Sequence, residues 1–225
     1  MFKAGIDQDA IVQMFSQASI QQGEALRKAV SDATLKALQG RELTLANIRK
    51  VLETVTQAAS MGAAQNNLPA VDMGDLLGKA FSGMDAALLQ AVQAHRKALQ
   101  QFVDQGISLR ETHMKAALAN IEKMEDVFFA TVGKAAQQAT GALQPAWEQV
   151  LAAMRIKGTD TGAQATSSVE QLMSQAQAAL RDGRAAGLRS AQAMMESYAT
   201  LVSGVLIGMS EGLQPGATEA KSRKN

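Results

Sequence analysis

The chain has 225 residues, with 22 lysines and arginines against 21 aspartates and glutamates, and it has no cysteine. The near balance of charge gives no electrostatic reason to expect nucleic acid as a partner, and the lack of cysteine excludes disulfides, thiolate catalysis and thiolate-bound metals. Helix-forming residues dominate, beside three prolines, six phenylalanines, one tryptophan and one tyrosine. We therefore expect an all-α fold, in which long antiparallel amphipathic helices form a helical bundle or coiled-coil-like hairpins within a single domain over 1–225.

The first third of the chain predicts two helices. One covers about 6–39, and the next covers 44–65 with Thr44 as its N-cap. Asn, Pro and Gly then mark 66–72 as a linker. Apolar residues of the second helix recur at spacings of three and four, as in a helix that packs on another helix: Leu45, Ile48, Leu52, Val55 and Ala59.

The middle of the chain predicts a hairpin of two long helices, 73–105 and 109–156. Ser108 and Glu111 have the spacing of a capping box that opens the second arm. Because the loop between the arms is so short, they should fold back antiparallel. Pro145 should kink or interrupt the second arm, since proline cannot donate to the helical hydrogen-bond ladder.

The last third predicts a linker at 157–167 and a final helix over 168–213, followed by a flexible tail at 214–225. The linker is rich in Gly, Thr and Ser, and Ser167 with Glu170 has the spacing of another capping box. If this final helix is uninterrupted, it is roughly 65 Å long at about 1.5 Å per residue.

Broad apolar faces on these helices are the main candidates for binding. In the simplest interpretation they pack together in a soluble bundle. Alternatively, some faces are stored against one another and reopen on an apolar or interfacial surface, which the adaptable methionines would favour. The candidate surface-binding residues are Leu77, Phe81, Met84, Leu88, Phe102, Phe128 and Trp147.

The stretch LVSGVLIGMSEGL, residues 201–213, is the least polar in the chain. The uncharged segment between Glu196 and Glu211 is shorter than the about twenty apolar residues that a bilayer span needs. Glycines four apart on one face allow a second helix to approach closely, within the chain or across a dimer, although interfacial insertion stays an alternative. The candidate helix-packing or self-association residues are Gly183, Gly187, Tyr198, Leu201, Gly204, Val205, Gly208 and Gly212.

Residues that could support catalysis are few. His95 falls on an apolar stripe, where a structural role is expected, and His113 has no partner at metal-ligand spacing. Glu122, Glu125 and Asp126 are interpreted as a solvated acidic face. The glycine-containing stretches lack the lysine and the strand context of a phosphate-binding loop. We therefore predict no enzymatic activity, no catalytic residue, no metal, no cofactor and no small-molecule substrate.

Two stretches, MDAALLQAVQAHRKALQQF and SVEQLMSQAQAALRDG, resemble phasins, the small bacterial proteins that coat polyhydroxyalkanoate storage granules. Three others, TLKALQGRELTLANIRKVLETV, AFSGMDAALL and ATVGKAAQQAT, are similar to those of an uncharacterised bacterial family of phasin-like helical proteins. The resemblance implies a non-enzymatic amphipathic protein that forms homo-oligomers and coats an apolar granule or lipid-rimmed surface. The glycine-patterned last helix is unusual for such a coat and favours a stable assembly.

Two other functions stay open. One is a soluble helical-bundle scaffold or regulator that binds protein partners, and the other is a membrane-active oligomer that inserts 201–210. Asp7 and Asp9 interrupt the basic-then-apolar order of a secretory signal, so we expect a cytoplasmic location, with the granule surface as the place of association.

Overall fold

The computed structural model describes residues 7–17, 23–39, 42–66, 72–104, 112–181 and 198–212. The regular secondary structure in these ranges consists of helices, without strands, which confirms the predicted all-α helical bundle. The helices are α1 (Gln8–Gln17), α2 (Gly23–Gln39), α3 (Leu45–Ala64), α4 (Met73–Asp104), α5 (Thr112–Glu122), α6 (Met124–Ala136), α7 (Leu143–Lys157), α8 (Asp160–Arg181) and α10 (Tyr198–Gly212).

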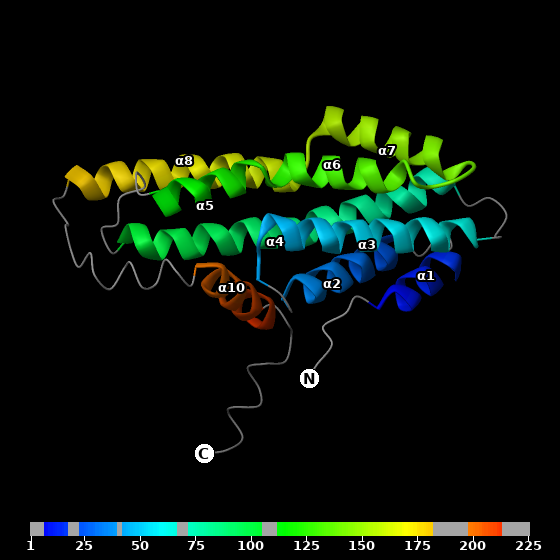
Figure 1. The fold of residues 1–225 in the computed structure, drawn as a ribbon, viewed down its shortest axis with the longest axis horizontal. Helices are drawn as coiled ribbons and strands as arrows, with labels where there is room; N and C mark the ends of the chain where they lie inside the picture. The colour runs from blue at the N-terminus through cyan, green and yellow to red at the C-terminus, as the bar shows by residue number, and fades with distance from the viewer. Residues whose placement is uncertain are drawn as a thin grey trace, which may run out of the picture.

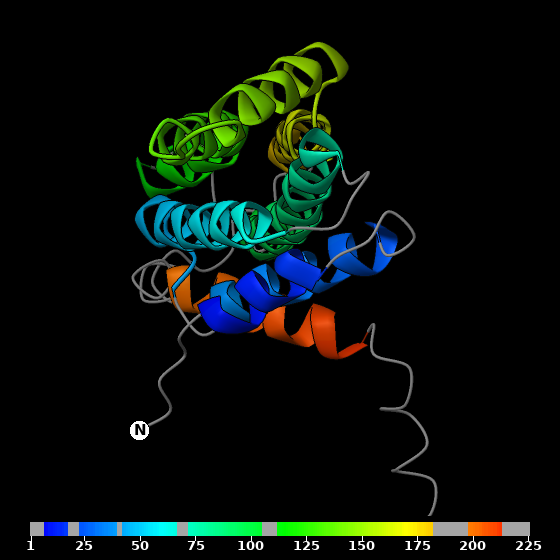
Figure 2. The ribbon, with the colours of Figure 1, turned by 90° about the vertical axis from the view of Figure 1, so that its right-hand side faces the viewer.

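Helix α4 is the central element of the bundle. It has 32 residues and contacts α2, α3, α5, α7, α8 and α10. In Figure 1, α3 and α4 occupy the middle, with α5 to α8 on one side and with α1, α2 and α10 on the other. The view turned by 90° in Figure 2 keeps these three layers. Helices α8 and α10 therefore lie on opposite sides of α4.

Apolar stripes on α4, α6 and α7 explain this layering, because they bury one another. The rings of Phe81 and Phe128 stack with their centroids 4.4 Å apart. Mutual packing removes these side chains from water in this bundle, and their reopening on an apolar surface stays a prediction. None of the seven predicted surface-binding side chains is more than 1% exposed: Leu77, Phe81, Met84, Leu88, Phe102, Phe128 and Trp147.

The helices α3 and α4 match the predicted ranges 44–65 and 73–105 closely. Thr44 is the N-cap of α3, as predicted, and its hydroxyl accepts a hydrogen bond of 3.2 Å from the backbone N–H of Asn47. The linker expected at 66–72 lies between these two helices, although its residues 67–71 are not among those described.

Two predicted long helices are divided in the structure. The segment 6–39 contains α1 and α2, and 109–156 contains α5, α6 and α7. A turn at Lys123 separates α5 from α6, and residues 137–142 separate α6 from α7. The second break comes just before Pro145, which lies in the first turn of α7, where the missing N–H is not needed.

The linker predicted at 157–167 is wrong. Only Gly158 and Thr159 separate α7 from α8, and Gly158 makes the turn with φ 79°, which a residue with a side chain rarely adopts. Ser167 and Glu170 lie inside α8 and do not cap it. Although Thr, Ser and Gly are poor helix formers, packing on α4 keeps this segment helical.

The single straight helix predicted over 168–213 is also wrong, because α8 and α10 pack on different sides of α4 (Figure 1). Hydropathy spacing predicts the helical segments, but it does not show on which side of α4 each of them packs. The predictions that lie outside the described residues concern the capping box of Ser108 and Glu111, the glycines Gly183 and Gly187, and the tail 214–225.

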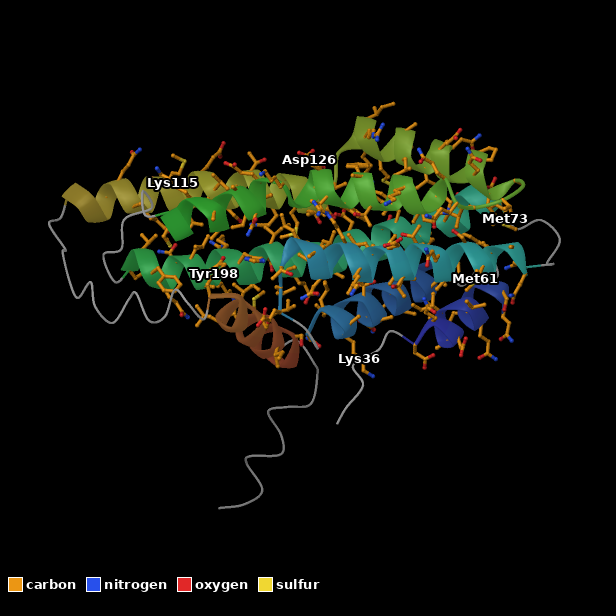
Figure 3. The ribbon with its side chains drawn as sticks, in the orientation of Figure 1. Lys36, Met61, Met73, Lys115, Asp126 and Tyr198 are labelled. Carbon is orange, nitrogen blue, oxygen red and sulfur yellow. The ribbon has the colours of Figure 1, made fainter. Side chains whose placement is uncertain are left out.

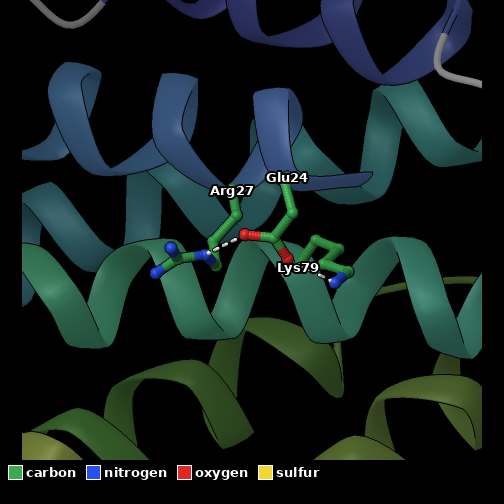
Figure 4. A network of polar contacts seen from close by, with 3 residues as sticks. All are labelled: Glu24, Arg27 and Lys79. Carbon is green, nitrogen blue, oxygen red and sulfur yellow. Dashed lines mark hydrogen bonds and ion pairs between the residues drawn. The ribbon is translucent and has the colours of Figure 1, made fainter. Parts of the chain in front are cut away.

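Helices α2 and α4 cross closely at Gly83. A β-carbon placed on Gly83 would lie 2.6 Å from the backbone oxygen of Arg27 and 2.8 Å from the β-carbon of Val30. Figure 4 shows an ion-pair network beside this crossing: Glu24 accepts from Arg27 Nε at 3.0 Å and from Lys79 Nζ at 2.8 Å. The hydrogen bond from Lys79 contributes most to the lowered pKa of the exposed Glu24 carboxyl, followed by that from Arg27.

Helices α1 and α3 make a similar close crossing at Gly62. A β-carbon on Gly62 would lie 2.5 Å from the β-carbon of Phe15 and 2.5 Å from the backbone oxygen of Val12. Beside it, the side-chain amide of the buried Asn66 donates to the backbone oxygen of Phe15 at 2.9 Å. Glycine therefore permits close helix packing at Gly62 and Gly83, two positions that the sequence analysis did not single out.

Candidate functional site

A cleft of about 480 Å³ lies among α1, α3, α6 and the turn before α7. Gln57 Nε2 donates to Gln138 Oε1 at 3.2 Å in its lining, and none of the described residues that line it is titratable. Of its two hydroxyls, that of Ser60 donates to the backbone of Thr56 and accepts from Trp147 Nε1. The described lining therefore offers no side chain of the kind that usually serves as a general acid or base.

A second cleft, of about 440 Å³, lies between the start of α4 and α7. Two acidic residues, Asp72 and Asp75, are in its described lining, and Asp72 caps α4, because Asp72 Oδ1 accepts from the backbone N–H groups of Gly74 and Asp75. Lys79, also in its lining, pairs with Glu24. Across the described part of the chain, no group of three or more His, Asp or Glu side chains is placed to hold a metal ion.

Buried Asp85 holds the start of α8 against α4. Its carboxylate accepts from the backbone N–H of Asp160 at 2.9 Å and from that of Thr161 at 3.1 Å. The Thr161 hydroxyl in turn donates to the backbone oxygen of Asp85 at 3.1 Å. These N–H groups have no partner within their own helix, and a carboxylate also offsets the positive end of the helix dipole. The Asp85 carboxylate therefore has a structural role, as the cap of the start of α8.

Thr159 and Glu125 complete this N-terminal cap. The Thr159 hydroxyl accepts from the backbone N–H of Gly162 at 2.9 Å and donates to the Glu125 carboxylate. The prediction of a solvated acidic face is therefore wrong for Glu125, because its carboxylate on α6 accepts a hydrogen bond from Thr159, the residue before α8. Glu122 and Asp126 are exposed, as predicted, and Asp126 is labelled in Figure 3.

The two polar aromatic side chains His95 and Tyr198 join α4 to α10. The Tyr198 hydroxyl and His95 Nδ1 share a hydrogen bond of 2.9 Å, and the Tyr198 ring also lies against Phe102, with centroids 6.2 Å apart. Figure 3 shows Tyr198 between the two helices. The structural role predicted for His95 agrees with this arrangement, although its partner was not predicted.

Burial keeps both members of this pair neutral. It lowers the pKa of His95 to about 4 and raises the pKa of the Tyr198 hydroxyl. The backbone of Leu43 opposes part of the His95 shift, although His95 Nε2 has no hydrogen bond of normal geometry to any described residue. A neutral histidine with one ring nitrogen engaged by tyrosine is a contact between two helices in this setting.

The inner face of α10 packs on α4 and α2. Val202 and Leu206 are fully buried, and Leu201 and Val205 are partly buried against the same core. Near the other end of α10, Gln39 Nε2 donates to Ser210 Oγ and connects the helix to α2. Tyr198, Leu201 and Val205 thus pack within the chain, which is one of the two roles that the sequence analysis left open for them.

The outer face of α10, defined here by Gly204, Ile207 and Gly208, points away from the described bundle. A β-carbon on either glycine would have no described atom within 4 Å, and Ile207 is 38% exposed. Close packing of these glycines within the chain is therefore not found among the described residues. Their predicted contact with a second copy stays a prediction. Gly212 is the last residue of α10.

Other large apolar side chains that are exposed lie on separate helices. Met61 is on α3, Ile156 on α7 and Met173 on α8. The outer face of α10 differs from these positions because an exposed isoleucine lies between two glycines on the least polar helix. Within the ranges that the structure describes, no helix has both the length and the apolar character required to cross a bilayer.

Sequence patterns gave partial signals for the features that were missed. Asp85 is a carboxylate inside the apolar stripe of α4, so it needed a buried donor. Gly83 precedes Ala87 and Ala91 at four-residue spacing, and all three are buried, as in a helix face that admits a close neighbour. No local pattern identifies Glu125 as the partner of Thr159.

Over residues 1–215 the sequence matches the model of a family of unknown function, DUF6781, and the chain belongs to that family. No curated protein and no solved structure matches the chain.

Proposed function

We propose that this member of the family is a non-enzymatic helical protein that self-associates and coats an apolar granule or lipid-rimmed surface in the cytoplasm. The outer face of α10 is its first point of contact. The observation that carries the proposal is the exposure of Ile207 between Gly204 and Gly208, with open space beside both glycines. An apolar side chain flanked by two positions without side chains can lie flat on a surface or against another helix.

Burial of the α4 stripe favours this order of contacts. Leu77, Phe81 and Phe102 cannot contact a partner while the bundle is closed. The outer face of α10 needs no rearrangement before contact. The phasin resemblance of the sequence supports the same class of partner, namely a polyester or lipid-rimmed surface together with further copies of this chain.

A second candidate function is a soluble scaffold that binds protein partners. Hydrogen bonds inside the bundle favour it: Trp147 Nε1 donates to Ser60 Oγ at 2.9 Å, and Asp85 accepts from the start of α8. Buried polar contacts of this kind fix one arrangement of helices and make opening costly. A scaffold would keep this arrangement when it binds, whereas a coat would gain contact area from any helix that it releases.

Density flotation distinguishes the candidates. The purified protein is mixed with polyhydroxyalkanoate particles, with phospholipid vesicles, or with neither, and its position in the gradient is measured. Flotation with polyester supports the granule coat. Flotation with vesicles, together with leakage of an enclosed dye, supports the membrane-active alternative that uses 201–210. Protein that stays at the bottom of all three gradients contradicts the coat and favours the scaffold.

Two substitutions test the role of α10. Ile207→Gln should reduce flotation, because it replaces the exposed apolar side chain by an amide, whereas the matched Met173→Gln on α8 should leave flotation unchanged. Gly208→Leu should disrupt close helix packing against a second copy of the chain, which sedimentation would measure as a smaller oligomer. The same substitution should preserve or strengthen adsorption of the protein to the particles. If Met173→Gln and Ile207→Gln behave alike, α10 is not the contact.

A further inference from the structure

We infer that α10 is a releasable strap: in solution it covers His95 and Phe102 on α4, and an apolar surface displaces it and takes up its inner face. This inference rests on the proposed function and names the step that controls it. First contact through the outer face of α10 would then lead to release and to a larger apolar contact. The inner face gained in this way includes Val202 and Leu206.

Two polar contacts that join α10 to other helices lie near its two ends. The Tyr198 hydroxyl shares its hydrogen bond with His95 on α4, and Ser210 accepts from Gln39 on α2. Between these contacts, packing of apolar side chains on α4 and α2 holds α10 in place. When α10 leaves, the four side chains of these two contacts can form hydrogen bonds with water. Breaking these contacts therefore leaves none of the four groups buried without a partner.

Helix α10 has features of a unit that opens locally. It has 15 residues, includes three glycines, and buries one face. Isolated helices of this length are marginal in water, and each glycine is less favourable than alanine. Helix α4, in contrast, has 32 residues and is buried by helices on several sides. Units with few buried apolar contacts open before the whole domain unfolds.

An apolar surface supplies the difference in free energy that release requires. In water, opening exposes Val202, Leu206 and the covered part of α4, so the closed state is favoured. On an apolar surface the same side chains leave water again. A surface can shift this equilibrium only by its preference for the open state, and here that preference comes from the inner face of α10.

Thiol labelling tests release directly, because the chain has no cysteine of its own. Val202→Cys on α10 and Val92→Cys on α4 are matched substitutions at positions of 0% exposure, and Ile207→Cys is the exposed reference. We expect Val202→Cys to react at least about tenfold faster than Val92→Cys in solution, and more slowly than Ile207→Cys. Equal rates for the two buried cysteines would mean that α10 opens only when the bundle unfolds, and would overturn the inference.

A disulfide lock tests the link to surface binding. In Gln39→Cys combined with Ser210→Cys, a short bis-thiosulfonate cross-linker should tie α10 to α2 through a disulfide at each cysteine, because cysteine is shorter than glutamine and the two sulfurs need not meet. Loss of free thiol reports that both cysteines have reacted. The cross-linked protein should float much less with polyhydroxyalkanoate particles than the same protein after reduction. Equal flotation of the two forms would show that binding needs no release. If the wild-type protein does not float at all, the proposed function fails, and the labelling rates still decide whether α10 opens.

Discussion

The backbone of Gly83 on α4 lies so close to that of Arg27 on α2 that a β-carbon on Gly83 would come within 2.6 Å of the Arg27 oxygen. Gly83→Ala should therefore lower the free energy of unfolding by about 1–3 kcal/mol, because one of two packed helices must move. Urea denaturation followed by circular dichroism measures the change.

Gly208→Ala is the matched control for that substitution. Its added β-carbon meets no described atom within 4 Å, and alanine favours the helix by about 1 kcal/mol. Stability should be unchanged or slightly higher. A loss of stability in Gly208→Ala equal to that in Gly83→Ala would contradict the assignment of the close crossing to Gly83.

The indole N–H of the buried Trp147 donates a hydrogen bond of 2.9 Å to Ser60 Oγ. Ser60→Ala should destabilise the protein by about 1–3 kcal/mol, because the indole N–H is left buried without an acceptor. In a Trp147→Phe background the same change should cost less, since no indole N–H remains. A double-mutant cycle from urea denaturation gives the coupling, and a coupling of zero would show that the hydrogen bond adds nothing.

Removal of the Asp85 carboxylate should weaken the start of α8. Asp85→Ala leaves the backbone N–H groups of Asp160 and Thr161 without their acceptor, and we expect a loss of about 1–2 kcal/mol, as for other N-cap deletions. The exposed Asp126 on α6 offers the control, because it lies in the first turn of its helix without a cap hydrogen bond among the described contacts, so that Asp126→Ala should cost only the helix-dipole contribution of about 0.3–1 kcal/mol. Thermal unfolding of both variants tests the difference, and equal melting temperatures would refute the capping role.

Acid should destabilise the protein through His95. The unfolded chain binds a proton on this ring below about pH 6.5, whereas the folded protein does so only near pH 4. Stability is therefore lost as the pH falls through this window, by about 2 kcal/mol between pH 7 and pH 5 for this group. His95→Gln should lack this component of the pH dependence, and urea denaturation at the two pH values measures it. An identical pH dependence in wild type and His95→Gln would disprove the assignment.

Local signals in the sequence predicted the helices that have clear boundaries. Thr44 could be identified as an N-cap because its hydroxyl bonds the backbone three residues later, within the same short stretch. Ser167 and Glu170 have the same kind of local signal, yet packing on α4 extends α8 back to Asp160. Tertiary contact therefore outweighs a capping pattern where a neighbouring helix supplies the cap.

Contacts between distant residues could not be predicted in this way. Gly62 and Gly83 were overlooked because a close crossing depends on which helix lies opposite, and spacing along one helix does not specify that partner. The apolar stripe was identified correctly as a face that leaves water, but whether a helix or an outside surface covers it depends on the whole fold. The same holds for His95, whose partner lies 103 positions along the chain.

The cap on α8 also bears on how the chain folds. Asp85 and the two backbone donors that it accepts from are 75 and 76 positions apart, with α5, α6 and α7 between them. Contacts of such wide separation require closure of a long loop and tend to form after local helices. We therefore expect this cap to be absent from the transition state for folding, so that Asp85→Asn raises the unfolding rate and leaves the refolding rate nearly unchanged.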